Sequence, residues 1–177
     1  MRKYYFCVDK RGLLFNDEFV KSGLRNIATA LKDKTFLDVT FKMLRPLKPD
    51  DYLINNNHKY THISPCRGEI NYVRCLDPNS SLVFTSLENR ENILSYAGNL
   101  THPFDVNLLR VHNGYMYHKI THHRHLKDTY GLLHPDIAFH LTSTTTCESQ
   151  SGGTCQEENF FIHYKGKNHL ICDQELN

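Results

Sequence analysis

The chain opens with the run Lys3-Tyr4-Tyr5-Phe6-Cys7-Val8, the turn Asp9-Lys10-Arg11-Gly12 and the apolar residues Leu13-Leu14-Phe15. Aromatic and β-branched residues on both sides of a turn that ends in glycine predict a β-hairpin. Most later apolar runs are equally short and are separated by Gly, Pro or Asn turns. The sequence therefore predicts a fold rich in strands.

In two regions the apolar residues recur at helical spacing instead. The first predicts two helices, at 19–31 and 35–44, and the second predicts one helix from about 134 to 141. Elsewhere the pattern predicts short strands and hairpins, with turns or breaks between them. The strands are expected at 51–54, 60–63, 70–75, 82–87 and 93–97, the hairpins at 108–117 and 160–172, a turn at 64–69 and a break at 98–103. The predicted fold class is α+β, with strand-rich meanders and hairpins and two or three helices.

The domain organisation is predicted as one compact unit over residues 1–177. The turns at 8–12 and 111–114 share a valine and a closing glycine, and this similarity suggests a duplicated hairpin-helix-strands motif. In that arrangement two similar halves would meet near 88–92. Residues 143–158 are rich in Ser, Thr and Gly and predict a flexible loop.

Composition excludes several classes of protein. Hydrophobic residues make up 40% of the 177 residues and charged residues 23%, which is ordinary globular usage, and no apolar run is long enough for a membrane span. The net charge of +2 comes from scattered basic residues, so nucleic acid is not expected as a partner. The six cysteines are irregularly spaced, which favours free thiols in a reducing compartment.

The densest polar cluster lies between residues 66 and 77. If a strand starts at Ile70, then Asn71 and Arg74 lie on opposite faces, and arginines, carboxylates and an amide are close along the chain. Such groups suit an anionic ligand or the acidic group of a protein partner, and a structural network of ion pairs is the alternative. The candidate binding residues are Cys66, Arg67, Glu69, Asn71, Arg74 and Asp77.

Twelve histidines are an unusual share for this length, and they concentrate in the second half of the chain. Imidazoles at these spacings could meet at a zinc ion, although no carboxylate occurs nearby before Asp128. The spacing is weak support, and a solvated loop explains it equally, so no cofactor is expected in the first instance. The alternative metal ligands are His118, His122, His123 and His125.

Short stretches along most of the chain match a known pattern. They are Tyr4-Tyr5-Phe6, Asp9, Gly12, Leu14, Phe15, Lys32-Asp33, Phe36-Leu37, Cys66, Glu69, Asn71, Arg74, Asp77, Val83-Phe84-Thr85, Leu94-Ser95-Tyr96 and Pro103-Phe104. In these residues the chain resembles an uncharacterised protein family that is widespread in animals and mostly thought to be mitochondrial. More distantly, it is similar to a bacterial family of unknown function with repeated α/β motifs. The resemblance implies a mitochondrial location, although no presequence precedes the first predicted strand; otherwise the expected location is cytoplasmic.

Two hypotheses of function follow. The first is a soluble, non-enzymatic binding or adaptor domain that holds an anionic small molecule or an acidic group of a partner at the cluster from Cys66 to Asp77. The second is a metal-dependent enzyme that uses the histidines between His118 and His125. The common nucleophile and phosphate-loop motifs are absent from the sequence, which favours the first.

Overall fold

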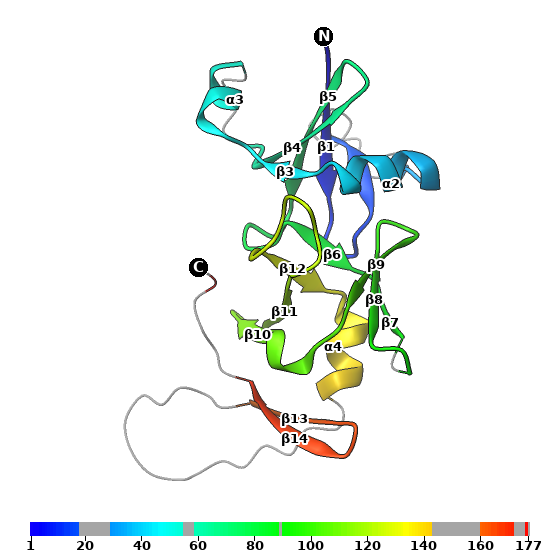
Figure 1. Ribbon diagram of the computed structural model, residues 1–177, viewed down its shortest axis with the longest axis vertical. Coiled ribbons are helices and arrows are strands. Elements are labelled where there is room, and N and C mark those ends of the chain that lie inside the picture. The colour runs from blue at the N-terminus through cyan, green and yellow to red at the C-terminus, as the bar shows by residue number, and fades with distance from the viewer. Residues whose placement is uncertain (18–28, 55–58, 89, 143–159, 172–175, 177) are drawn as a thin grey trace.

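The computed structural model describes residues 1–17, 29–54, 59–88, 90–142, 160–171 and 176 (Figure 1). Strands outnumber helices over these residues and form several small sheets, which confirms the predicted α+β class. No helix in these ranges is long and apolar enough to cross a membrane. The predicted loop at 143–158 and most of the predicted helix at 19–31 fall outside the described residues.

The first sheet has the strand order β2-β1-β5-β4-β3, formed by β1 (Arg2–Val8), β2 (Leu14–Asn16), β3 (Arg45–Pro46), β4 (His62–Cys66) and β5 (Glu69–Cys75). β1 and β2 form the predicted hairpin, and β1 also pairs with β5 in parallel. Val73 of β5 joins the main core, whereas Tyr72 packs with Tyr60 and Ile63 on the other face. The alternation expected along the strand from Ile70 is therefore confirmed.

Helix α2 (Lys34–Lys42) confirms the helix predicted at 35–44. The Asp33 side chain accepts a hydrogen bond from the backbone N–H of Phe36 and caps the first turn. Phe36 then packs edge-on against Phe6 of β1, with 5.7 Å between the ring centroids. This packing fixes the helix on the sheet and places its last turn, with Lys42, at the border of the second half of the chain.

The predicted strand at 51–54 is wrong, because these residues belong to helix α3 (Pro49–Ile54). Pro49 suits a first helical position, and Asp50 and Asp51 favour the positive end of a helix. The Asp51 carboxylate also accepts hydrogen bonds from the backbone N–H of Lys48 and from both terminal guanidinium nitrogens, Nη1 and Nη2, of Arg45. These contacts outweigh the weak strand pattern.

The described part of the second half forms three further sheets. β6 (Leu82–Phe84) joins β12 (Tyr130–Leu133), β11 (Tyr115–Lys119) and β10 (Leu109–His112) in the order β10-β11-β12-β6, and the short helix η2 (Val106–Leu108) precedes β10. β7 (Ser86–Glu88), β8 (Ile93–Tyr96) and β9 (Leu100–Pro103) form a meander. Helix α4 (Pro135–Thr142) precedes the hairpin of β13 (Phe160–Tyr164) and β14 (Lys167–Ile171), so the predicted helix near 134–141 and both predicted hairpins are confirmed.

Three strand boundaries differ from the prediction. The strand expected at 82–87 is divided at Thr85 between two sheets, and the turn expected at 64–69 is reduced to Arg67-Gly68. The predicted break at 98–103 is wrong, because only the turn at 97–99 interrupts the strands and β9 follows it. Pro103 is tolerated because it ends a strand at the edge of the sheet, where no ladder donor is needed.

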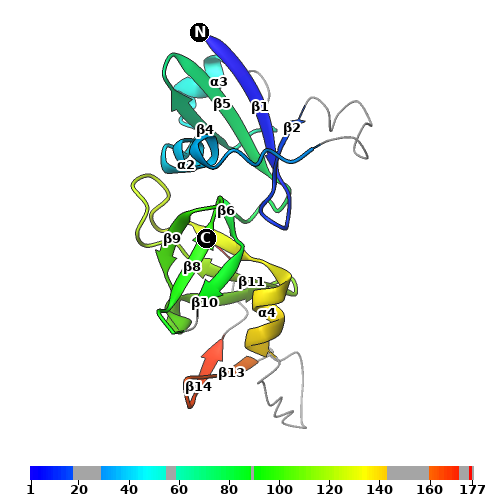
Figure 2. The same ribbon diagram turned by 90° about the vertical axis from the view of Figure 1, so that its right-hand side faces the viewer.

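The sheets of the two halves change over at residues 76–81, between β5 and β6, as Figure 2 shows. β7 ends at Glu88 and pairs with β8, which begins at Ile93. One apolar cluster continues across the changeover, because Phe41 and Val73 from the first half belong to the same core as Phe84 and Leu109. The pocket described below lies where the two halves meet.

Gly12 provides a stability test of this junction. Its φ of +82° is a conformation that favours glycine, and a Cβ built there would lie 2.6 Å from Cγ2 of Thr85 in the second half. We expect Gly12→Ala to lower the free energy of unfolding by about 2–4 kcal/mol, from the positive φ and the forced overpacking together. Gly68→Ala is the matched control, because Gly68 has a φ of +84° and open space around the position of its Cβ. Equal losses for the two variants in urea unfolding would contradict the close approach.

Candidate functional site: a cationic pocket between the two halves

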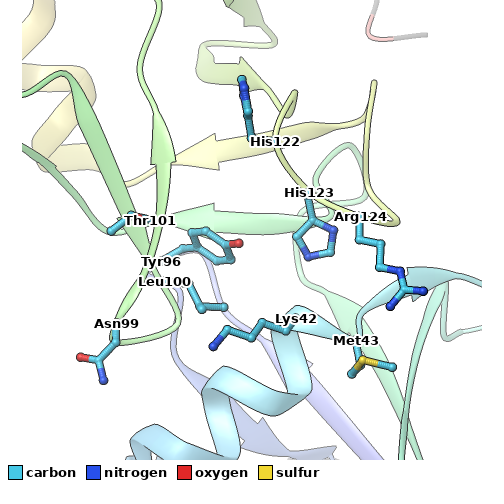
Figure 3. A pocket seen from close by; sticks show the side chains of 9 residues that line it. All are labelled: Lys42, Met43, Tyr96, Asn99, Leu100, Thr101, His122, His123 and Arg124. Carbon is cyan, nitrogen blue, oxygen red and sulfur yellow. The ribbon is translucent and has the colours of Figure 1, made fainter.

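A pocket of about 470 Å³ lies between the end of α2, the turn from β8 to β9 and the loop that follows β11 (Figure 3). This volume is in the range of small-molecule sites. Its lining combines residues from both halves of the chain, which the sequence separates by more than fifty positions. We call it the interhalf pocket, and its lining residues are Lys42, Met43, Tyr96, Asn99, Leu100, Thr101, His122, His123 and Arg124.

The charged side chains that line the interhalf pocket are cationic, and no carboxylate belongs to its described lining. Within the described residues, no hydrogen bond or ion pair engages the guanidinium of Arg124. Lys42 pairs with Asp38 one helical turn earlier, at 3.5 Å and largely exposed, which is a weak interaction in water. The pocket therefore offers positive charge that the protein itself neutralises only in part.

Tyr96 is the most buried polar side chain of the pocket, with 5% of its surface exposed. The Tyr96 ring packs against Phe84 and Phe41, and Figure 3 shows the hydroxyl pointing toward His123. No hydrogen bond engages this hydroxyl among the described residues, and its oxygen, unlike the ring, is accessible to solvent. Burial, together with the nearby charge of Asp38, raises the pKa of Tyr96, so the hydroxyl keeps its proton and can donate a hydrogen bond.

Two imidazoles hold the loop that carries His122 and Arg124. Nε2 of His102, on β9, accepts hydrogen bonds from the backbone N–H groups of Thr121 at 2.9 Å and His122 at 3.3 Å. Nδ1 of His123 accepts from the N–H groups of His125 and Leu126, and its Nε2 donates to the carbonyl oxygen of Phe41 in α2. His123 thus joins the loop directly to the helix on the other side of the pocket.

The four histidines proposed as alternative metal ligands have other partners or directions. His118 is fully buried and its Nε2 accepts a hydrogen bond from the Asp105 N–H at 3.0 Å. His123 uses both ring nitrogens as described above, and His122 contacts Thr121 through Nδ1. Over the described residues, no three His, Cys, Asp or Glu side chains are grouped so that they could hold a metal ion.

The six residues predicted to bind an anion do not come together at one point. Cys66, Arg67 and Glu69 lie at one end of β5, and Arg74 and Asp77 lie at its other end, roughly 20 Å away at the usual rise per strand residue. Arg67 is exposed in the turn and Glu69 faces Arg2 at 3.7 Å. Asn71 is buried in the middle of β5, and the carboxylate of Asp77 accepts a hydrogen bond from the hydroxyl of Tyr117.

Arg74 has an internal partner that the sequence did not indicate. Its guanidinium donates two hydrogen bonds, of 2.7 and 3.1 Å, to the carboxylate of Asp17, which is fully buried. Lys59 and the hydroxyl of Tyr60 donate to the same carboxylate, each at 2.7 Å. Burial alone would raise the pKa of Asp17, but these donors hold it well below its usual range. Arg74 therefore belongs to a structural network of charges.

A serine and a histidine also meet away from the pocket, where Nε2 of His62 lies 3.1 Å from Oγ of Ser81. Such a pair is the beginning of a nucleophile and its base. However, both side chains are more than nine-tenths buried, and Nδ1 of His62 faces the hydroxyl of Thr61 instead of a carboxylate. The contact therefore fastens β4 to the chain that leads into β6.

The sheets and the pocket between them define an α+β protein with a cationic, ligand-sized site at the junction of its two halves. The chain belongs to the family described as domain of unknown function DUF4505, which matches residues 1–176. The uncharacterised family expected from the sequence is thereby confirmed. No solved structure matches the chain. Because the family description assigns no activity, any function has to be argued from the pocket.

Proposed function

We propose that this protein binds a small anionic molecule in the interhalf pocket. The observation that carries the proposal is the charge of the lining, because Lys42 and Arg124 are its charged side chains and Arg124 has no hydrogen bond or ion pair among the described residues. An anionic oxygen would pair with these cations, and the protonated Tyr96 hydroxyl could donate a hydrogen bond to it. This reading keeps the anionic ligand expected from the sequence and moves its site from β5 to the pocket.

The charge of the lining supports an anion over a neutral ligand. An arginine without an internal partner can give two parallel hydrogen bonds to a carboxylate or phosphate, and such charge-assisted bonds are about twice as strong as neutral ones. Asn99 and Thr101 add neutral donors at the same pocket. The hydrogen bonds of His102 and His123 hold the loop that carries Arg124 in place before a ligand arrives. This order reduces the entropy lost on binding.

Arg124→Met is the direct test of this site. We expect thermal unfolding of the wild-type protein to shift upward with a panel of organic phosphates and carboxylates, and this shift to be lost in Arg124→Met, because the variant removes the unpaired cation. Arg67→Met is the matched control, since Arg67 is an exposed arginine of the first predicted cluster and lies outside the pocket. Loss of the shift in Arg67→Met with retention in Arg124→Met would place the anion at the turn between β4 and β5, and no shift with any anion would overturn the proposal.

A further inference from the structure

The two fully cationic side chains of the interhalf pocket point in different directions. In Figure 3 the ammonium group of Lys42 points toward Leu100, below the ring of Tyr96, whereas the guanidinium of Arg124 points toward Met43. The ring of His123 lies between them in this view. The two charges therefore do not converge on one position.

The centre of the pocket offers no charged donor. Both ring nitrogens of His123 are engaged, with the Phe41 carbonyl oxygen on one side and the backbone N–H groups of His125 and Leu126 on the other. In Figure 3 the apolar stem of Lys42 runs between the two charges, with Leu100 near the ammonium and Met43 near the guanidinium. An apolar part of a ligand would fit this region, and a charged part would lack a partner there.

We propose that the ligand of the interhalf pocket is a small organic dianion whose two anionic groups are separated by a short apolar linker, one group at Lys42 and the other at Arg124. This inference rests on the proposed function and adds the class of ligand. A single anionic group could reach only one of the two cations, while a dianion of matching length would engage both. Asn99 is the neutral donor nearest the Lys42 end, and the Tyr96 hydroxyl points toward His123, between the two cations.

The charges around each end agree with two separate anion positions. At the Lys42 end, Asp38 is the charged neighbour, at 3.5 Å from the ammonium. The Lys42 side chain is 61% exposed and its ammonium has three donors, so it can bind a ligand oxygen while it keeps this contact. At the Arg124 end, the guanidinium has no partner among the described side chains, and His122 points away from it in Figure 3. Both positions can therefore accept an anionic group, provided that Lys42 keeps its contact with Asp38, whose Oδ1 is buried and has no hydrogen-bond partner among the described residues.

The test is titration calorimetry of the full chain with straight-chain α,ω-dicarboxylates from succinate to suberate and with monocarboxylates of equal length. We expect one dicarboxylate to bind at least about tenfold more tightly than its matched monocarboxylate. We also expect Lys42→Met and Arg124→Met each to weaken that dicarboxylate by about tenfold, and only one of them to weaken the monocarboxylate. Arg67→Met should leave both affinities unchanged.

The outcomes separate this inference from the proposed function. Equal binding of the mono- and dicarboxylates, or sensitivity of the dicarboxylate to only one of the two variants, would overturn the dianion while the anion pocket stands. Absence of binding for every carboxylate and for an organic bisphosphate would overturn the anion pocket itself. Thermal unfolding of each variant by circular dichroism is the control for folding. Lys42 and Arg124 are exposed, so we expect both variants to keep the wild-type thermal midpoint. A loss of affinity at an unchanged midpoint then comes from the pocket.

Discussion

Arg74→Met is expected to lower the free energy of unfolding by about 3–5 kcal/mol, because it removes the main partner of a buried carboxylate. The side chain of Asp17 is fully buried and that of Arg74 is 13% exposed, so water cannot replace the two lost hydrogen bonds. Lys59 and Tyr60 would still donate to Asp17 and would limit the loss. Urea unfolding at neutral pH measures the difference.

The matched control is Arg45→Met. Arg45 also donates two hydrogen bonds to one carboxylate, that of Asp51, at 2.7 and 3.0 Å, but this pair is more open to solvent, with 24% and 17% of the side chains exposed. Its loss should lower the free energy of unfolding by only about 1 kcal/mol. Equal losses of unfolding free energy in the two variants would contradict the role given to burial. An Arg74→Met variant as stable as the wild type would show that Asp17 needs no arginine.

We expect the protein to unfold in acid at a pH well above the range in which its carboxylates titrate. Burial lowers the pKa of His62, His102 and His118 to about 4 each, against about 6.5 in an unfolded chain. Between these values the unfolded state binds more protons, so stability is full above pH 6.5 and is lost as the pH falls toward 4. Each histidine contributes roughly 3 kcal/mol to this loss, and three such terms match the whole stability of an ordinary domain.

The measurement is the urea midpoint from pH 7.5 to 4.5 for the wild type and for His62→Gln, His102→Gln and His118→Gln. Each glutamine removes one titrating group, so each variant should show a smaller dependence on pH, whatever its stability at pH 7.5. The low pKa of Asp17 affects stability only below this window, since an ordinary aspartate titrates near pH 3.9. A wild-type midpoint that is constant down to pH 5 would contradict the buried neutral histidines.

Local patterns were sufficient for much of the secondary structure. The hairpin of β1 and β2, the helix α2 and the alternation along β5 could be predicted because each depends on residues adjacent in sequence. The errors have a common cause in tertiary contacts. Residues 51–54 belong to α3, which the ion pair of Arg45 with Asp51 stabilises. The apolar run at 82–87 is divided because its two parts pair with strands of different sheets.

The amino-acid sequence by itself determined the α+β class and the hairpins, and its polar cluster from Cys66 to Asp77 suggested an anionic ligand. Only the tertiary structure decided where such a ligand could bind. Arg74 stood beside other charges in the sequence, yet folding pairs it with Asp17, fifty-seven residues away, and so removes it from the candidates. Folding also brings Lys42 and Arg124 to one pocket and leaves them without a full internal partner. The physical reason is that neighbours in space decide whether a charged side chain is already paired within the protein or is available to a ligand. Local sequence patterns show only the neighbours along the chain.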